Sequence, residues 1–368
     1  VILLAVKKFK GGDFKIHTYI KNIARGALIA ALYAALTVSL APISYGSVQF
    51  RVSEALTLLP FYFPEAIPGL TIGCVFANFF GGFGLTDMFF GSLATLLAAF
   101  LTAKSKKLRP SFVFLFAKAL GIEITEEVYH LACAVELVHN STLVHDDILD
   151  NAETRRGKVS LNFKLGNSLS VLAGDILLAA ALQQLVKCKN LNAVNAFANC
   201  LYKMCRGEIN QNFSIGKIPS MKEYIQKSEH KTAELFKAPL ISLFYLYDIP
   251  EKENILNFAY NFGIAFQIKD DLLNILNTDS SKPALSDIHN GIYTAPVLFL
   301  NEDEKIEYLN EEKIAELVQN KKYINKTVEL IKQYAVEAIN SIDFISDNIY
   351  KQEIIKITEN LYKAGINE

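Results

Sequence analysis

The chain has 368 residues and a formal net charge of −1, because 37 Lys and Arg residues stand against 38 Asp and Glu residues. This balance gives no bulk electrostatic attraction to a polyanion, so we exclude nucleic acid as a partner. The length is that of about two or three domains. Five cysteines without a CxxC pair indicate reduced, intracellular thiols.

The first 103 residues differ in composition from the rest. Charged side chains are scarce between residues 26 and 103, where they are limited to Arg51, Glu54, Glu65 and Asp87. A spanning helix needs ~20 apolar residues, and a soluble helix of such length would show a polar face. We predict that residues 1–103 are a membrane-embedded segment of about four transmembrane helices, with lipid around residues 26–103. Basic flanks at 7–25 and 104–109 indicate the cytoplasmic membrane, with the remaining chain in the cytoplasm.

Three runs in this segment are APISYG at 41–46, QFRVSEALTLLP at 49–60 and PEAIPG at 64–69. On these runs, residues 20–103 resemble the queuosine precursor transporter family. The resemblance implies a substrate-binding membrane subunit of an energy-coupling-factor importer. Because that family has about six membrane helices, this segment resembles a truncated member.

From Lys104 onward the sequence predicts a second, all-α domain over residues 104–368. Apolar residues recur at helical spacing, without strand alternation, at 123–150, 169–187, 221–246 and 253–276. Glycines and prolines fall between these segments or just beyond them.

The predicted helices contain two acidic clusters. Asp146 and Asp150 are four residues apart and share one helical face, next to Arg155 and Arg156. Mg²⁺ is typically held by one or two carboxylates plus substrate phosphate oxygens, and arginine binds phosphate bidentately. The second cluster has the same spacing and comprises Gln267, Asp270, Asp271 and Asn274. Two such faces can clamp one diphosphate between them.

The clusters belong to an ordered series of motifs. The series is KSKKLRP at 104–110, His139 two helical turns before Asp146, DDILD at 146–150, Arg155 and Arg156, Lys231 and Thr232, FQIKDD at 266–271, and Lys282. It resembles the trans-isoprenyl diphosphate synthases over nearly all of residues 104–368. The resemblance implies an all-α isoprenoid-synthase bundle that lacks the helices usually found ahead of the first motif, and a homodimer.

The resemblance also implies a reaction. An allylic diphosphate ionises, the double bond of isopentenyl diphosphate attacks the carbocation, and a proton leaves, so that a trans-polyprenyl diphosphate grows. The cofactor is Mg²⁺, with about three ions per active site, acting as Lewis acid and template.

Site residues follow from the resemblance. The metal ligands are Asp146, Asp150, Asp270 and Asn274, the last standing where the family has aspartate. The catalytic residues are Asp146, Asp147, Asp150, Arg155, Lys231 and Asp270. The substrate-binding residues are Lys106, Arg109, His139, Arg155, Arg156, Lys231, Thr232, Gln267 and Lys282.

Product length depends on Ser141 and Thr142, which lie about one helical turn before Asp146. In the family, bulky aromatic residues there close the product cavity, so small ones predict a product longer than farnesyl.

Three alternatives stay open: an importer subunit, a non-functional fusion of two truncated modules, and a terpene cyclase. A cyclase would share an aspartate motif but not the residues for isopentenyl diphosphate, such as Lys106 and Arg109.

Overall fold

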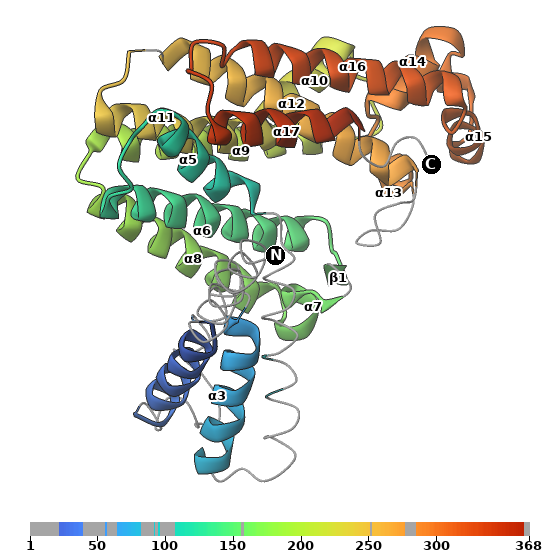
Figure 1. Cartoon of the computed structure of the whole chain (residues 1–368). Coiled ribbons are helices and arrows are strands. Elements are labelled where there is room, and N and C mark those ends of the chain that lie inside the picture. Colours follow the sequence, from blue (N-terminus) through green and yellow to red (C-terminus); the bar gives the residue numbers. More distant parts are fainter. Residues whose placement is uncertain are drawn as a thin grey trace, which may run out of the picture. The chain divides into compact units, whose positions relative to one another are not determined.

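The computed structural model describes residues 22–39, 56, 65–81, 92, 95, 107–155, 158–250, 252–276 and 285–363. The chain divides into two compact units, Val1–Lys106 and Lys107–Glu368, which we describe separately. The described residues are almost entirely helical (Figure 1), which confirms the predicted all-α fold.

In the first unit, two apolar helices lie side by side, Asn22–Ser39 and α3 (Ala66–Gly81). They approach closely because glycines face the partner helix. A Cβ on Gly69 would lie 2.5 Å from the backbone oxygen of Gly26, and one on Gly73 would lie 2.7 Å from a backbone oxygen one turn further along. Small residues at a helix contact are typical of helix pairs in lipid, where close packing drives association.

The two helices run parallel. Their N-terminal ends lie together, where Arg25 and Glu65 form an ion pair of 3.4 Å. Among the described residues, two helices are long and apolar enough to cross a bilayer: Asn22–Ser39, and Asn167–Lys187 in the second unit. The apolar helix α3 is shorter. Most of residues 40–103 lies outside the described part, so the prediction of about four membrane helices is not confirmed.

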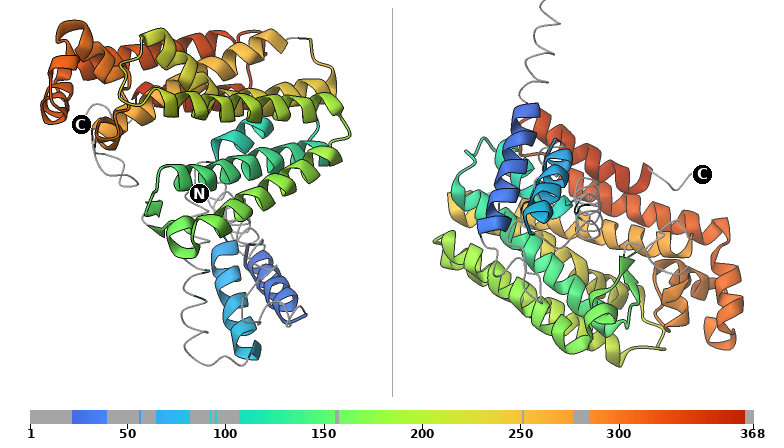
Figure 2. Two further views of the ribbon diagram at one scale, coloured as in Figure 1. Left: turned by 180° about the vertical axis from the view of Figure 1, so that it is seen from behind. Right: turned by 90° about the horizontal axis from the view of Figure 1, so that it is seen from below.

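The second unit is a bundle of helices with one short antiparallel strand pair. Its elements are α5 (Leu108–Ala119), α6 (Glu126–Leu149), β1 (Thr154–Arg155), β2 (Lys158–Val159), α7 (Leu161–Leu165), α8 (Asn167–Lys187), α9 (Leu191–Phe213), α10 (Met221–Ser228), the π-helix η2 (Glu229–Ala233), α11 (Glu234–Tyr247), α12 (Lys252–Ile275), α13 (Ser286–His289), α14 (Ala295–Asp303), the 3₁₀ helix η3 (Ile306–Tyr308), α15 (Glu311–Val318), α16 (Lys321–Asn340) and α17 (Ile349–Lys363). In this unit α12 packs against both α11 and α16 (Figures 1 and 2).

A buried group of phenylalanines holds α12 in place. The ring of Phe112 in α5 meets those of Phe236 in α11 and of Phe258 and Phe262 in α12 edge to face. The centroid of the Phe112 ring lies 6.0 Å from that of Phe236, 5.5 Å from that of Phe258 and 4.7 Å from that of Phe262. Each buried ring contributes about 1.5–3 kcal/mol, and edge-to-face geometry adds about 0.5–1.5 kcal/mol per pair. The second acidic cluster therefore extends from a rigidly seated helix.

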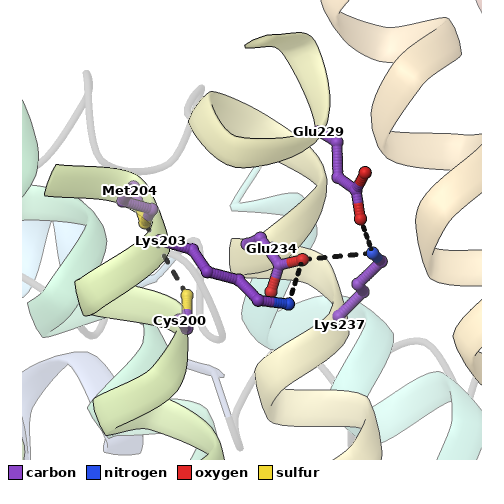
Figure 3. A network of polar contacts seen from close by, with 6 residues as sticks. All are labelled: Cys200, Lys203, Met204, Glu229, Glu234 and Lys237. Carbon is purple, nitrogen blue, oxygen red and sulfur yellow. Dashed lines mark hydrogen bonds and ion pairs between the residues drawn. The ribbon is translucent and has the colours of Figure 1, made fainter. Parts of the chain in front are cut away.

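A charged network brackets η2 (Figure 3). Glu234, at the start of α11, accepts hydrogen bonds from Lys203 of α9 at 3.0 Å and from Lys237 at 3.1 Å. Lys237 also bonds to Glu229, the first residue of η2. Because Glu234 is buried, loss of either lysine would weaken the compensation of a buried charge. The network fixes η2 at both of its ends.

Candidate active site

The first aspartate cluster lies at the end of α6. Asp146 is partly buried, whereas Asp150, which follows the last helical residue, is exposed. Burial raises the pKa of Asp146 to about 6, against the opposing positive charge of Lys231. The negative charges of Glu208 and Asp150 raise it further. The two carboxylates predicted to share a face thus interact with each other at an open helix end.

Asp147 has a different environment from its neighbours. Its carboxylate is buried and accepts a hydrogen bond from Arg155 Nε at 2.6 Å. Its backbone oxygen accepts another from the side-chain amide of Asn162 at 3.1 Å. The pairing of β1 with β2 turns the chain back directly after α6. Asp147 therefore holds Arg155 beside the first cluster.

In the second cluster the two adjacent aspartates also differ, since Asp270 is exposed and Asp271 is buried. The Asp271 carboxylate accepts hydrogen bonds from Gln267 Nε2 at 2.7 Å and from the Tyr224 hydroxyl at 2.6 Å. Burial raises the pKa of Asp271 to about 7, and the negative charge of Asp287 adds to the effect. The buried carboxylate of Asp271 is therefore hydrogen-bonded by neutral donors, while the carboxylate of Asp270 lies at the surface of α12.

Lys231 links the two clusters from η2. Burial lowers the pKa of Lys231, but the carboxylates of Glu208, Asp146, Asp150 and Asp271 together raise it above its ordinary value. The ammonium nitrogen lies 3.8 Å from Glu208. These acidic residues come from α9, α6 and α12, so both aspartate clusters act on one ammonium group. A π-helical turn such as η2 is frequent at functional sites.

Thr232 joins η2 to α12. Its hydroxyl donates to Gln267 Oε1, and the amide of Gln267 donates to Asp271. The two elements approach closely because residue 263 is glycine, where a Cβ would lie 2.4 Å from the Cα of Ala233. The structure thus brings the predicted residues Thr232 and Gln267 together with the second cluster.

A second cationic group lies at the start of α5. Arg109 Nη1 is 3.2 Å from His139 Nε2, and the guanidinium carbon is 4.7 Å from the centre of the Phe236 ring. Burial lowers the pKa of Arg109 to about 10, opposed first by the Glu136 carboxylate and more weakly by Asp270. Arg109 stays charged at neutral pH. The predicted pair Arg109 and His139 is therefore adjacent and within electrostatic reach of the second cluster.

Of the two residues predicted to govern product length, Ser141 lies at the α6–α8 contact and Thr142 is the next residue of α6. Ser141 is buried, and its hydroxyl donates to the backbone oxygen of Gly174 in α8 at 2.9 Å. The Thr142 hydroxyl donates to the backbone oxygen of His139 within α6, also at 2.9 Å. Both hydroxyls are satisfied by backbone, so neither needs a polar partner from a ligand.

Three predicted site residues lie outside the described part of the chain: Lys106, Arg156 and Lys282. Conversely, α10 contributes Tyr224 and Lys227, which the sequence patterns did not single out. Burial lowers the pKa of Lys227, and the charge of Lys231 lowers it further. Neither Tyr224 nor Lys227 carried a local signal: seven residues separate Tyr224 from Lys231, but η2 interrupts the α-helical register between them.

Known proteins resemble this chain over most of its length. The family model described as polyprenyl synthetase matches residues 91–335. A prenyl transferase of Cyanidium caldarium is 34% identical over 278 residues, covering 71% of this chain and 86% of that protein. The mitochondrial solanesyl-diphosphate synthase 1 of Oryza sativa subsp. japonica is 33% identical over 294 residues, covering 70% of this chain and 68% of that protein.

A solved structure agrees with these matches. Heptaprenyl diphosphate synthase from Staphylococcus aureus superposes with a TM-score of 0.68 at 26% identity, covering 74% of this chain and 90% of that chain. The fold of the bundle is therefore that of the isoprenoid synthases. The family match begins at residue 91, ahead of the second unit. The resemblance of residues 20–103 to queuosine precursor transporters stays a prediction.

Proposed function

Because the chain belongs to the polyprenyl synthetase family, we propose that its two aspartate clusters hold one allylic diphosphate while isopentenyl diphosphate binds beside them. The reaction is a prenyl transfer that lengthens a trans-polyprenyl diphosphate by ionisation, condensation and elimination. The observation that carries this assignment is the position of Lys231, whose ammonium nitrogen lies 3.8 Å from Glu208 of α9, next to Thr232, which bonds to Gln267 of α12. An ammonium group among acidic side chains from several helices is suited to a polyanionic leaving group that arrives with divalent cations.

The donor set fits Mg²⁺, which takes oxygen ligands, commonly one or two carboxylates together with substrate oxygens and water. Asp146, Asp150 and Asp270 offer carboxylates from two helices, and Asn274, one turn beyond Asp270, offers an amide oxygen. The described residues contain no group of three or more His, Cys, Asp or Glu side chains that could bind a metal ion by themselves. We therefore expect oxygen atoms of the substrate to complete the coordination. Bound there, Mg²⁺ would supply Lewis-acid neutralisation of the departing diphosphate.

Cationic side chains share the diphosphate charge. Lys231 and Arg155 flank the first cluster, and Asp147 bonds to the Nε of Arg155. Arg109 and His139 are placed to bind the diphosphate of isopentenyl diphosphate, which keeps its charge throughout. Charge-assisted hydrogen bonds of this kind are about twice as strong as neutral ones. Three residues outside the described part complete the proposed set: Lys106, Arg156 and Lys282.

We further propose a long-chain product. Ser141 and Thr142 are small, and their hydroxyls are bound to backbone rather than to side chains. These two positions on α6, one turn from the metal-binding face, therefore place no aromatic floor in the path of a growing prenyl chain. The relatives named above as solanesyl and heptaprenyl diphosphate synthases support a product longer than farnesyl.

A homodimer through α8 is the assembly that we propose. This helix has the composition of a membrane span but belongs to a unit that is otherwise rich in charge. Its apolar side chains are exposed, including Leu172 at 57% and Ile176 at 68%. A contiguous exposed apolar face typically marks a protein–protein interface. In a dimer with a twofold axis, the α8 face of one copy would pack against the α8 face of the other.

For the first unit we propose attachment to the cytoplasmic membrane, with the bundle on the cytoplasmic side. Asn22–Ser39 is long and apolar enough to span, and its Leu28 is 61% exposed. The hydroxyl of Thr37 bonds back to the oxygen of Tyr33 in the same helix at 2.8 Å, so it needs no water. Sedimentation of the full chain with lipid vesicles tests this proposal. Recovery in the supernatant, with the enzyme active, would contradict it.

The importer alternative finds no support in the comparisons, since the relatives and the solved structure are synthases. The decisive experiment incubates the full chain with Mg²⁺, farnesyl diphosphate and labelled isopentenyl diphosphate. We expect label in products longer than farnesyl, and none with Asp146→Ala or Asp270→Ala. Glu316→Ala, at an exposed site on α15, is the matched control. Consumption of farnesyl diphosphate without incorporation would instead indicate a terpene cyclase.

A further inference from the structure

Each aspartate cluster contains one buried carboxylate beside a more exposed one. In the first, Asp147 is paired with the cation Arg155. In the second, Asp271 is 8% exposed and has no cation within salt-bridge distance among the described residues. Instead its Oδ1 accepts from Gln267 at 2.7 Å and its Oδ2 from the Tyr224 hydroxyl at 2.6 Å. Both oxygens of this buried carboxyl group are therefore held by neutral donors.

Tyr224 reaches Asp271 from a separately fixed helix. The first turn of α10 is closed by a capping box, in which the Ser220 backbone amide donates to Glu223 Oε2 at 2.7 Å and the Glu223 amide donates to Ser220 Oγ at 3.3 Å. The Tyr224 side chain is 2% exposed. Because α10 continues directly into η2, the bond to Asp271 ties the segment that carries Lys231 to α12.

A second path joins the same two segments. The Thr232 hydroxyl donates to Gln267 Oε1, and Gln267 Nε2 donates to Asp271 Oδ1. Tyr224 and Thr232 thus lie at the two ends of one hydrogen-bonded chain that passes through both oxygens of Asp271. A fully satisfied buried network of this kind rigidifies the elements that it joins.

We propose that Tyr224 is a positioning residue of this prenyltransferase: its hydroxyl holds the Asp271 carboxylate in the interior, which leaves the exposed Asp270 as the metal-facing carboxylate and keeps Lys231 in register with both clusters. This inference rests on the proposed function of the aspartate clusters. Loss of the hydroxyl leaves Asp271 Oδ2 without its donor. The carboxylate then turns outward and competes with Asp270 for the metal.

The test is Tyr224→Phe in the full chain, which keeps the ring and removes only the hydroxyl. Partners that orient metal ligands typically contribute about 10–100-fold to metal affinity or activity. We expect the Mg²⁺ concentration for half-maximal rate to rise about tenfold and kcat to fall within that range. The KM for isopentenyl diphosphate should change less than about twofold, because Arg109 and His139 are not touched. Mn²⁺ binding in the presence of inorganic pyrophosphate, measured by electron paramagnetic resonance, should weaken by a similar factor without any turnover.

Tyr247→Phe is the matched control. It removes another tyrosine hydroxyl, one bonded to Thr125 at 2.8 Å and to neither aspartate. We expect its Mg²⁺ and Mn²⁺ responses to equal those of the wild type. A general loss of tyrosine hydrogen bonding would affect both variants alike.

The double variant Tyr224→Phe/Asp271→Asn removes the charge together with its donor. An unpaired buried amide costs less than an unpaired buried carboxylate, because the penalty is larger for charged groups. Metal binding should therefore be restored to within about threefold of Asp271→Asn alone, even if Tyr224→Phe does not fold. An unchanged metal response in Tyr224→Phe, or additive losses in the double variant, would overturn the inference. An inactive wild type that does not bind Mn²⁺ with pyrophosphate would refute the proposed function itself.

Discussion

Gly263 is the position where the smallest change should have the largest effect on the site. A Cβ there would lie 2.4 Å from the Cα and 2.6 Å from the Cβ of Ala233, the last residue of η2. Ordinary van der Waals separation begins at 3.4 Å, so Gly263→Ala forces η2 and α12 apart by about 1 Å. Both elements are anchored elsewhere, by the network around Glu234 and by the phenylalanine cluster. The displacement therefore falls on the segment that carries Lys231.

The expected magnitudes follow from that distance. A misplacement of about 1 Å in an active site costs about 100-fold in rate, so kcat should fall to about 1%. Overpacking costs about 1–3 kcal/mol, partly offset by about 0.5–1 kcal/mol for alanine over glycine in a helix. The melting temperature should therefore fall by about 2–6 °C.

Initial rates of label incorporation and differential scanning fluorimetry measure both effects. Adding Ala233→Gly removes the methyl group at residue 233, but the backbone of that residue still lies 2.4 Å from the new side chain, so recovery should be incomplete. A Gly263→Ala enzyme with a kcat within about twofold of wild type would refute the claim that this approach positions Lys231.

Four further predictions test separate parts of the structure. Because the pKa of Asp146 is raised from 3.8 to about 6 on folding, its contribution to stability is present at low pH and is lost as pH rises through about 6. Asp146→Asn should thus raise the melting temperature of the metal-free protein at pH 7.5 by about 2–4 °C while abolishing turnover. Ser141→Phe should shorten the product, as read by chromatography of the hydrolysed prenyl alcohols. Ile176→Glu should convert the proposed dimer to a monomer in light scattering. Asp147→Asn should weaken binding of the allylic diphosphate without loss of the fold, as measured by calorimetry with a non-ionisable analogue.

The first three of these predictions each have a contrary outcome. A melting temperature of Asp146→Asn that falls at pH 7.5 would contradict the burial penalty on that carboxylate. An unchanged product from Ser141→Phe would refute the cavity argument. A dimer that persists in Ile176→Glu would place the interface elsewhere than α8.

The helical class and the order of the clusters were predictable because their signals are local. Spacing alone puts Asp146 and Asp150 on one face of a helix. The clusters also stand in an ordered series that a single motif does not provide. The approach of Lys231 to Glu208 of α9, and of Thr232 to Gln267 of α12, depends on tertiary packing, which spacing within any one helix does not contain.

The π-helical turn and the role of Tyr224 were not predictable in the same way. A π-helix differs from an α-helix by one residue in its hydrogen-bond register, and no residue type marks it in the sequence. The phenol of Tyr224 has no local signature that distinguishes a donor to a buried carboxylate from a core aromatic. In the first unit the apolar runs predict about four membrane spans, of which the described residues contain one helix of spanning length, Asn22–Ser39, so the predicted number stays a prediction.

The two aspartate pairs also show why motif membership does not define a residue's role. The second aspartate of each pair is the more buried one, and its oxygen contacts are to the protein: Arg155 for Asp147, and Gln267 and Tyr224 for Asp271. The partners differ in charge, so the consequences of neutralising them differ. Asp147→Asn removes the counter-charge of Arg155, so the guanidinium is no longer held beside the first cluster and binding of the allylic diphosphate weakens. If Asp147 instead contacted metal, the same variant would raise the Mg²⁺ requirement and leave binding of a metal-free diphosphate unchanged.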